Sequence, residues 1–364
     1  MARHITELRI PAFRGVKDLS LTDLGDVNII VGDNNCGKTS VLEAIQLVSD
    51  PVEYNIFQVA GLRLKHSNPK KDFDNYEIIK NLLSTVNDGA GKEKYLLDIS
   101  ATAENKTNFL RISGKNYYIL ENGNEILSLS LSLSSSSLTN GNLLITPDRV
   151  MVTIPFDVDS SNGNVTVHDT ISIIKPANYN PDVVIGAVYS IDHVINNDYK
   201  HIFNNIPQTT KAISLLKRYN ENIVAMRYLN KNGEPVPVID SDSREGTPVH
   251  EYGDGMKKVL AIIEAILKSE DGILLVDEFE DAIHPSAMND SFSFILKACK
   301  EMKIQLFLTT HSIEAIDSLL GCTEAEPDNI RVITLKKRNG KTYSQTIDGG
   351  EAEMLRMNNN AELR

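Results

Sequence analysis

Residues 27–48 read VNIIVGDNNCGKTSVLEAIQLV, and this stretch decides the fold. It opens with a short run of apolar, mostly β-branched residues at 27–31, which is typical of a buried parallel strand. Residues 32–39 then fit the spacing G-x-x-x-x-G-K-[ST] of a phosphate-binding loop. Apolar residues follow at a helical spacing up to position 48. Because a strand precedes the loop and a helix follows it, nucleotide binding is favoured over a chance glycine turn.

Each residue type in the loop has a role toward a triphosphate. Glycines let the backbone bend so that its N–H groups point inward, and the helix that follows directs its positive dipole end at the phosphates. Lys38 would supply a charge for the β- and γ-phosphates, and the hydroxyl of Thr39 would bind Mg²⁺. We therefore expect ATP and Mg²⁺ as cofactors. The nucleotide-binding residues predicted from the loop are Gly32, Asp33, Asn34, Asn35, Cys36, Gly37, Lys38, Thr39 and Ser40.

A second motif stands at residues 273–278, which read ILLVDE. A hydrophobic strand ends there in two acids, at the carboxyl edge of the sheet where α/β folds bind ligands. Asp277 is predicted to hold Mg²⁺ together with Thr39. Glu278 is predicted to act on the attacking water, either as general base or by orienting it. A charged turn is the alternative, and the preceding buried strand disfavours it.

A third motif, LFLTTHS at 306–312, brings a histidine to the end of another buried strand. An imidazole there could hydrogen-bond the γ-phosphate and report its presence. A lone histidine is more often structural, but the placement after a phosphate loop and an acid pair favours function. The predicted catalytic residues are Lys38, Glu278 and His311.

Composition limits the class of protein. The chain has 364 residues, room for roughly two domains, with 41% hydrophobic and 24% charged residues, as in a globular protein. Its net charge of −12 gives no general attraction for nucleic acid, although residues 65–71 and 336–338 with Lys341 could form local basic patches. We interpret the first segment as a solvated loop and the second as a hairpin tip. Three cysteines without a C-x-x-C pair, and no signal peptide or membrane-spanning run, favour the cytoplasm.

The order of elements predicts an α/β protein whose nucleotide-binding core is split by an insertion. The core is expected at 1–90 and 245–364, with an antiparallel β subdomain at 91–185 and a helical and hairpin insertion at 186–244. Asn-Gly pairs between alternating segments predict hairpins, and ILSLSLSL at 126–133 predicts a half-buried strand. Other expected elements are a helix at 76–87, helical structure at 186–226, a polar loop at 240–247, helices at 256–267 and 286–302, a strand at 304–309 and a hairpin at 330–347.

Together the three motifs resemble the ABC-type ATPases, specifically the SMC/RecF branch and the OLD family. The resemblance covers residues 3–48 and about 249–364. It implies that the loop is Walker A, that Asp277-Glu278 is Walker B, that FEDAIHP at 279–285 is the D-loop region and that His311 is the switch histidine. It also implies that Arg14 approaches the nucleotide, and it leaves Gln58 as a weak candidate for the Q-loop.

The resemblance implies a signature motif at 252–258, YGDGMKK, with Gly253 and Gly255 contacting the γ-phosphate held by a partner subunit. The usual Ser-Gly-Gly is Gly-Asp-Gly here, so a hydroxyl donor is replaced by a carboxylate, and an ordinary turn is the alternative. If the motif contacts the partner's γ-phosphate, ATP joins two subunits head to tail in a homodimer or higher oligomer. Slow hydrolysis then loosens this assembly. No Asn-Lys-x-Asp motif is present, which makes GTP a less favoured nucleotide.

Full-length OLD proteins add a Toprim nuclease domain, and we expect none in the roughly fifty residues that follow His311. We therefore expect a separate effector, nuclease or toxin-like, and by family analogy a role in bacterial anti-phage defence. The alternatives are a RecF-like DNA-binding repair ATPase and a non-hydrolysing scaffold that uses ATP only for assembly.

Overall fold

The computed structural model describes residues 4–49, 59, 74–87, 93–103, 106–121, 124–135, 141–145, 150–153, 188–191, 202–203, 206–231, 233–278, 288–322, 329–359 and 363. Three of the sequence-based expectations lie outside these residues. They are the D-loop region at 279–285, the Q-loop candidate Gln58 and the basic segment at 65–71.

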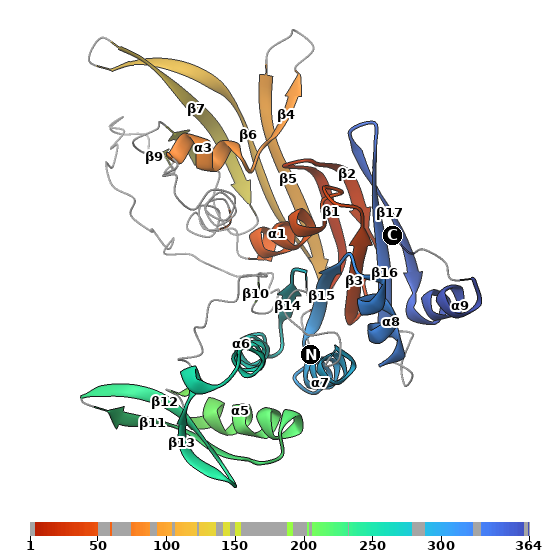
Figure 1. Cartoon of the computed structure of the whole chain (residues 1–364). Coiled ribbons are helices and arrows are strands. Elements are labelled where there is room, and N and C mark those ends of the chain that lie inside the picture. The colour runs from red at the N-terminus through yellow and green to blue at the C-terminus, as the bar shows by residue number, and fades with distance from the viewer. Residues whose placement is uncertain are drawn as a thin grey trace.

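The sheet that carries the phosphate loop has six strands in the described part of the chain, in the order β10-β14-β15-β3-β16-β17 (Figure 1). Its first five strands run parallel, and β17 is antiparallel to β16. The strands are β3 (Val27–Gly32), β10 (Val188–Ile191), β14 (Ile273–Val276), β15 (Gln305–Thr310), β16 (Ile330–Arg338) and β17 (Lys341–Asp348). The final hairpin is confirmed. The helical structure expected at 186–226 is confirmed at 206–219 and wrong at both ends, because residues 188–191 form β10 beside β14 and a strand begins at Ile223.

A second, antiparallel sheet follows the order β2-β1-β5-β6-β7-β8-β9, with β4 paired to β5. The strand predicted at 126–133 is confirmed as part of β7, where Leu131 is buried while Ser132 is exposed. The strands are β1 (Ile5–Phe13), β2 (Val16–Leu21), β4 (Ser84–Asn87), β5 (Glu93–Ala103), β6 (Lys106–Glu121), β7 (Asn124–Ser135), β8 (Gly141–Ile145) and β9 (Val150–Thr153). The helix expected at 76–87 is shorter, because α3 (Asn75–Lys80) gives way to β4.

A third, three-stranded sheet of β11 (Ile223–Lys231), β12 (Glu234–Ser241) and β13 (Arg244–Pro248) lies beside α5 (Ile206–Tyr219) (Figure 1). The loop expected at 240–247 was wrong for its second half, because residues 244–248 pair with β12. Two hydrogen bonds from the Arg227 guanidinium to the Asp240 carboxylate, at 2.7 and 3.1 Å, cross-link β11 and β12.

Helix α1 (Lys38–Ser49) lies between the two large sheets. Alternate residues of the parallel sheet point toward this helix and the antiparallel sheet, among them Ile30, Leu275 and Phe307. Their neighbours in sequence point to the opposite face, where helices cover them. Burial on both faces explains why these strands are continuous runs of apolar residues.

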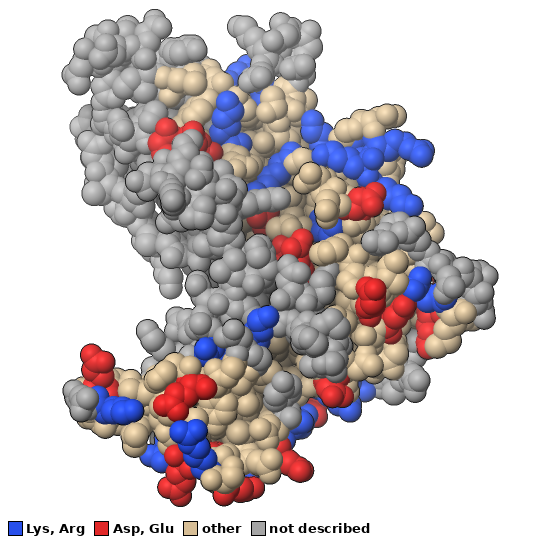
Figure 2. All heavy atoms as spheres, in the orientation of Figure 1, with Lys and Arg blue, Asp and Glu red and all other residues tan. Residues whose placement is uncertain are grey.

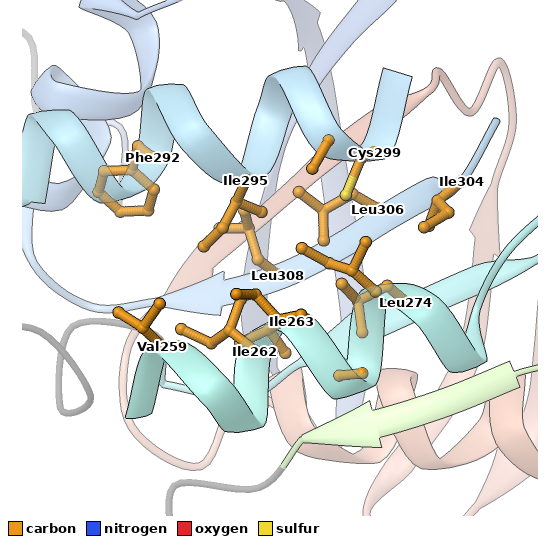
Figure 3. Close-up of a cluster of buried hydrophobic side chains, with 14 of the residues drawn as sticks. Val259, Ile262, Ile263, Leu274, Phe292, Ile295, Cys299, Ile304, Leu306 and Leu308 are labelled. Atoms are coloured by element: carbon orange, nitrogen blue, oxygen red, sulfur yellow. The ribbon is translucent and has the colours of Figure 1, made fainter. Parts of the chain in front are cut away.

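The opposite face is covered by α6 (Asp254–Lys268), α7 (Met288–Glu301) and α8 (Ile313–Gly321), with α9 (Gly349–Asn359) next to α8. Figure 3 shows side chains of α6 and α7 meeting over β14 and β15. Both helices show the predicted spacing of apolar residues, and both predictions are confirmed. The labelled side chains of this cluster are Val259, Ile262, Ile263, Leu274, Phe292, Ile295, Cys299, Ile304, Leu306 and Leu308.

A buried polar contact joins the two large sheets at the other end of β15. The side chain of Gln305 accepts a hydrogen bond from the backbone N–H of Ile5 (2.9 Å) and donates to the carbonyl oxygens of Ile5 (2.9 Å) and Gly25 (2.8 Å). It therefore satisfies backbone groups that would otherwise be buried without partners. None of the helices in the described part of the chain has the length and apolar character needed to cross a membrane.

Candidate active site

The three sequence motifs leave the parallel sheet at the same edge. Strand β15 lies between β14 and β3, and the register places Val276 beside Leu308 and Thr310 beside Val31. The chain direction is the same in all three strands, so the Walker B acids, the histidine segment and the phosphate loop follow one another along this edge. This edge is where open α/β sheets bind ligands.

The phosphate loop depends on its two glycines. Gly32 has a φ of +143° and Gly37 a φ of +112°, both in a region that side chains rarely adopt. A Cβ atom at Gly32 would meet the carbonyl oxygen of Leu335 in β16, and one at Gly37 would lie 2.7 Å from Val16. The loop is therefore enclosed by β16 on one side and by the β1–β2 turn on the other.

Side chains within the loop divide into exposed and buried groups. Asp33, Asn34 and Asn35 are exposed, and Asn35 has a φ of +63°. Cys36 is buried, and burial raises the pKa of its thiol above the usual value. The thiol is therefore held in its neutral form beneath the loop. Thr39 and Ser40 lie in the first turn of α1, which begins directly after the loop.

Lys38 is only 7% exposed and extends back over the loop. Its ammonium group donates hydrogen bonds to the carbonyl oxygens of Gly32 (2.7 Å) and Asp33 (3.2 Å). A lysine in this position places its charge at the mouth of the loop, where the β- and γ-phosphates of a nucleotide are expected.

The Walker B acids are joined to the neighbouring strand by one hydroxyl group. Thr309 of β15 donates a hydrogen bond from Oγ1 to Oδ1 of Asp277 (2.5 Å) and accepts one from the backbone N–H of Glu278 (2.9 Å). Glu278 has a φ of +46°, a left-handed conformation that costs about 1–2 kcal/mol for a residue with a side chain. The backbone at Glu278 is thus strained at the point where the base is predicted.

His311 is exposed and lies between the end of β15 and the start of α8. Ser312 caps α8 by accepting from the N–H of Ala315 (3.2 Å), and its own N–H donates to Oγ1 of Thr310 (3.0 Å). These bonds fix the backbone on the C-terminal side of His311, so the imidazole is presented from a structured segment at the edge of the sheet.

Arg14 is placed differently from the loop residues. Its side chain is 6% exposed, its guanidinium pairs with Glu43 of α1 at 3.2 Å, and a weaker contact of 3.5 Å reaches the carbonyl oxygen of Val59. The backbone of Arg14 is also held, because its N–H donates to Leu82 and its carbonyl accepts from Ser84. The structure therefore shows an anchor between the β1–β2 turn and α1, and contact with a nucleotide stays a prediction.

The predicted signature motif coincides with the start of α6. Gly253 is the N-cap, it is exposed, and a Cβ atom added there would meet nothing within 4 Å. The residue at Gly255 lies in the first turn of this helix. The helix start is thus accessible to a ligand from outside the subunit, and the trans contact itself stays a prediction.

The donor set fits a magnesium ion. Asp277 offers a carboxylate that is 8% exposed, and Thr39 offers a hydroxyl at the loop, both hard oxygen ligands of the kind Mg²⁺ prefers. Within the described residues no group of three or more His, Cys, Asp and Glu side chains could hold a metal.

Two features of the site were not foreseen from the sequence. One is Thr309, whose polar side chain in an otherwise apolar strand end, LFLTT, was the available signal. The other is the closure of the loop by Leu335, which depends on the pairing of strands 300 residues apart and has no local signal.

The fold and the motifs at this edge define a P-loop ATPase. Residues 27–317 match the family described as "AAA domain, putative AbiEii toxin, Type IV TA system". The chain belongs to this family, since the match covers well over half of its length.

Several known proteins are similar to the chain. An "ATP/GTP phosphatase" of Helicobacter pylori is 24% identical over 335 residues, which is 86% of this chain and 87% of that protein. Among solved structures, the SMC head domain from Thermotoga maritima has a TM-score of 0.45 at 12% identity, covering 94% of this chain and 99% of the other. The CbiO1 protein of Clostridium perfringens, part of the ABC transporter complex CbiONQ, has a TM-score of 0.42 at 11% identity and covers 98% and 96%.

Proposed function

We propose that the chain binds and slowly hydrolyses ATP, forms head-to-tail dimers while ATP is bound, and through this cycle regulates a separate effector protein. The observation that carries the proposal is the shared sheet edge, where the loop with Lys38, the Asp277-Glu278 pair and the segment with His311 follow one another on adjacent parallel strands.

Each group has a task in hydrolysis. Lys38 and the N–H groups of the loop bind the β- and γ-phosphates, and Thr39 and Asp277 would hold Mg²⁺, which neutralises charge that develops on the phosphate oxygens. Glu278 accepts a proton from the attacking water as general base. His311 donates a hydrogen bond to the γ-phosphate and loses it when that group leaves. We expect turnover to be slow, because a switch must keep its γ-phosphate long enough for the ATP-bound state to act.

The exposed start of α6 supports the dimer. The first backbone N–H groups of a helix have no acceptor within the preceding turn and favour an anion. The N–H of Met256 already donates to the carbonyl oxygen of Gly253 (3.1 Å), so the groups that remain for a phosphate are those at the very start of the helix, where Gly253 leaves space for close approach. If these groups bind the γ-phosphate of a partner subunit, each ATP joins two chains. The dimer then exists only while the γ-phosphate is present, which is the differential contact that a switch requires.

The proposed biological setting is bacterial anti-phage defence in the cytoplasm, with similarity to OLD-family ATPases. The family description, which names a putative AbiEii toxin and a Type IV toxin–antitoxin system, supports a setting of this kind. The effector is expected to be a nuclease or toxin-like protein. A neighbouring gene that encodes one, and an effector activity that changes when ATP replaces ADP, would support this part of the proposal.

The direct test uses two variants and a control. Glu278→Gln is expected to abolish turnover and trap the ATP dimer, measured by phosphate release and by light scattering after size exclusion. Lys38→Ala is expected to remove ATP binding, while Glu351→Gln, an exposed acid on α9, serves as the control and leaves both unchanged. If the wild type shows no ATPase activity and Glu278→Gln behaves identically, a non-hydrolysing scaffold replaces the enzyme. Turnover should be measured with ATP and GTP, and we expect ATP to be preferred.

One observation favours a second function, RecF-like binding of DNA. Lys336, Lys337, Arg338 and Lys341 are exposed at the tip of the β16–β17 hairpin, and Figure 2 shows Lys and Arg gathered there. Lysine and arginine on one surface attract a phosphate backbone despite a net charge of −12. Lys336→Glu with Arg338→Glu should then weaken salt-dependent duplex binding, and Lys300→Glu with Lys303→Glu on another face should not. Absence of duplex binding by the wild type at low salt would exclude this function.

A further inference from the structure

The hydroxyl group of Thr309 makes a hydrogen bond to each of the two Walker B residues, as donor to one and as acceptor from the other. A hydroxyl has one proton to donate, and that proton is directed at Oδ1 of Asp277 at 2.5 Å. A lone pair of the same oxygen accepts the backbone N–H of Glu278 at 2.9 Å. Thr309 is fully buried and Asp277 is 8% exposed, so water does not compete easily for either bond.

The position of Thr309 follows from strand pairing. Val276 of β14 lies beside Leu308 of β15, so the next residue on each strand, Asp277 and Thr309, also lie side by side. The strand that carries His311 therefore supplies the hydroxyl that orients the acids at the end of its neighbour. Two motifs that are separated by about 30 residues in sequence are coupled through this single oxygen atom.

The bond to Glu278 also bears on its backbone. With a φ of +46°, the backbone of Glu278 is not extended, so its side chain leaves in a different direction from that of a strand residue. The hydrogen bond from its own N–H fixes the peptide plane between Asp277 and Glu278. The orientation of the Asp277 carboxylate and the backbone of Glu278 thus depend on the same hydroxyl group, that of Thr309.

We propose that Thr309 is a positioning residue that sets the direction of Asp277 toward the metal and of Glu278 toward water. It does not touch the nucleotide. It acts through the two acids, as outer hydrogen-bond partners orient the ligands of metal sites in general. This inference rests on the proposed function, since it assigns a role in the same site.

The test compares Thr309→Val, which keeps the shape and loses the hydroxyl, with Thr309→Ser, which keeps it. Thr342→Val is the matched control, because Thr342 is a buried threonine in the same sheet whose hydroxyl has no hydrogen-bond partner within the described residues. Two quantities are measured on each folded protein: the affinity for a fluorescent ATP analogue with Mg²⁺ and with EDTA, and kcat for ATP hydrolysis. Melting temperatures show whether each variant is folded at the assay temperature.

We expect Thr309→Val to keep its metal-free affinity for the analogue and to lose about 10-fold or more of the gain that Mg²⁺ provides, with a similar or larger fall in kcat. Thr309→Ser should restore both, and Thr342→Val should change neither. A valine variant with an unchanged magnesium gain and unchanged kcat overturns the inference, as does an equal loss of affinity with and without Mg²⁺.

The magnesium gain separates this inference from the proposed function. If the wild type binds ATP without hydrolysing it, hydrolysis fails as a function, while the loss of the magnesium gain in Thr309→Val and its return in Thr309→Ser still establish the role of Thr309. If Thr309→Val does not fold, Thr309→Ala replaces it, with the same expected results.

Discussion

Leu335 and Gly32 are in direct contact across the β16–β3 pair, with the carbonyl oxygen of Leu335 in the space that a Cβ atom of Gly32 would need. The contact lies where β3 turns into the phosphate loop. The backbone of a strand near the end of the chain therefore determines which residue can start a loop near its beginning.

Gly32→Ala is expected to weaken ATP binding by at least about 10-fold, because the alanine must shift either the loop or β16 and its φ of +143° adds strain. Binding of a fluorescent ATP analogue measures the effect. Gly233→Ala is the matched control, since Gly233 also has a positive φ (+89°) but open space around it. The control should lose about 1 kcal/mol of stability and no affinity. Wild-type affinity in Gly32→Ala would show that the loop tolerates the displacement.

The ion pair between Arg14 and Glu43 is expected to stabilise the fold, since both side chains are largely buried, at 6% and 13% exposed. Removing one partner leaves a buried charge, so Arg14→Gln and Glu43→Gln should each lower the free energy of unfolding by roughly 3 kcal/mol. The double variant should lose clearly less than the sum of the two.

Denaturant unfolding gives the free energy of unfolding of the wild type, the two single variants and the double variant. Arg9→Gln is the control and should change this free energy little, because its pair with Glu7 is exposed. The same proteins also test the predicted approach of Arg14 to the nucleotide. A loss of ATP affinity in Arg14→Gln without any in Glu43→Gln would support it, whereas equal affinities would leave Arg14 with a structural role alone.

Gln305→Leu should lower the free energy of unfolding by roughly 2–4 kcal/mol. The leucine keeps the volume but leaves the N–H and carbonyl of Ile5 and the carbonyl of Gly25 without the partners that Gln305 provides. Gln345→Leu, an exposed glutamine on β17, is the control and should change stability little. Equal unfolding midpoints for the two variants would contradict a role for Gln305 in joining the sheets.

Alkaline pH is expected to destabilise the protein partly through Cys299. Burial raises the pKa of this thiol from 9.0 to about 12. The unfolded chain therefore releases the proton at a lower pH than the folded protein does, so the stability linked to this group is complete below about pH 9 and is lost as the pH rises toward 12.

Between pH 9 and 11, wild-type stability should fall more steeply than that of Cys299→Ala, by up to about 1.4 kcal/mol per pH unit. Urea unfolding at several pH values measures both slopes. Cys322→Ala, at a half-buried thiol, should change the slope less. Parallel profiles for wild type and Cys299→Ala would rule out this origin.

The parts of the fold that local pattern determines were predicted from the sequence. The strand, loop and helix at 27–48, the strand before Asp277 and the strand before His311 have apolar patterns with clear ends, and the structure has them. Strand β10 was missed because four residues, VYSI, carry no periodicity, and only pairing with β14 makes them a strand. β13 was missed because its polar residues gain a strand conformation from β12.

The sequence predicted which residues belong to the site, but it did not predict which side chains they contact. Asp277 and Glu278 could be assigned as acids at a sheet edge, but the hydroxyl that joins them is on another strand. Arg14 could be singled out only through the family resemblance, and its ion pair with Glu43 depends on the packing of a turn against a helix. Contacts between distant segments depend on the tertiary fold, which short-range periodicity does not specify.

Helix α1 begins at the phosphate loop and is packed on both sides, against the parallel sheet and against β1, β5 and β6 of the antiparallel sheet. A dense interior transmits small displacements without absorbing them. Movement of the first turn of α1 is therefore expected to reach β5 and β6 of the antiparallel sheet, which carry none of the predicted catalytic residues. A partner protein bound to that sheet would then respond to the presence of the γ-phosphate without contacting the nucleotide.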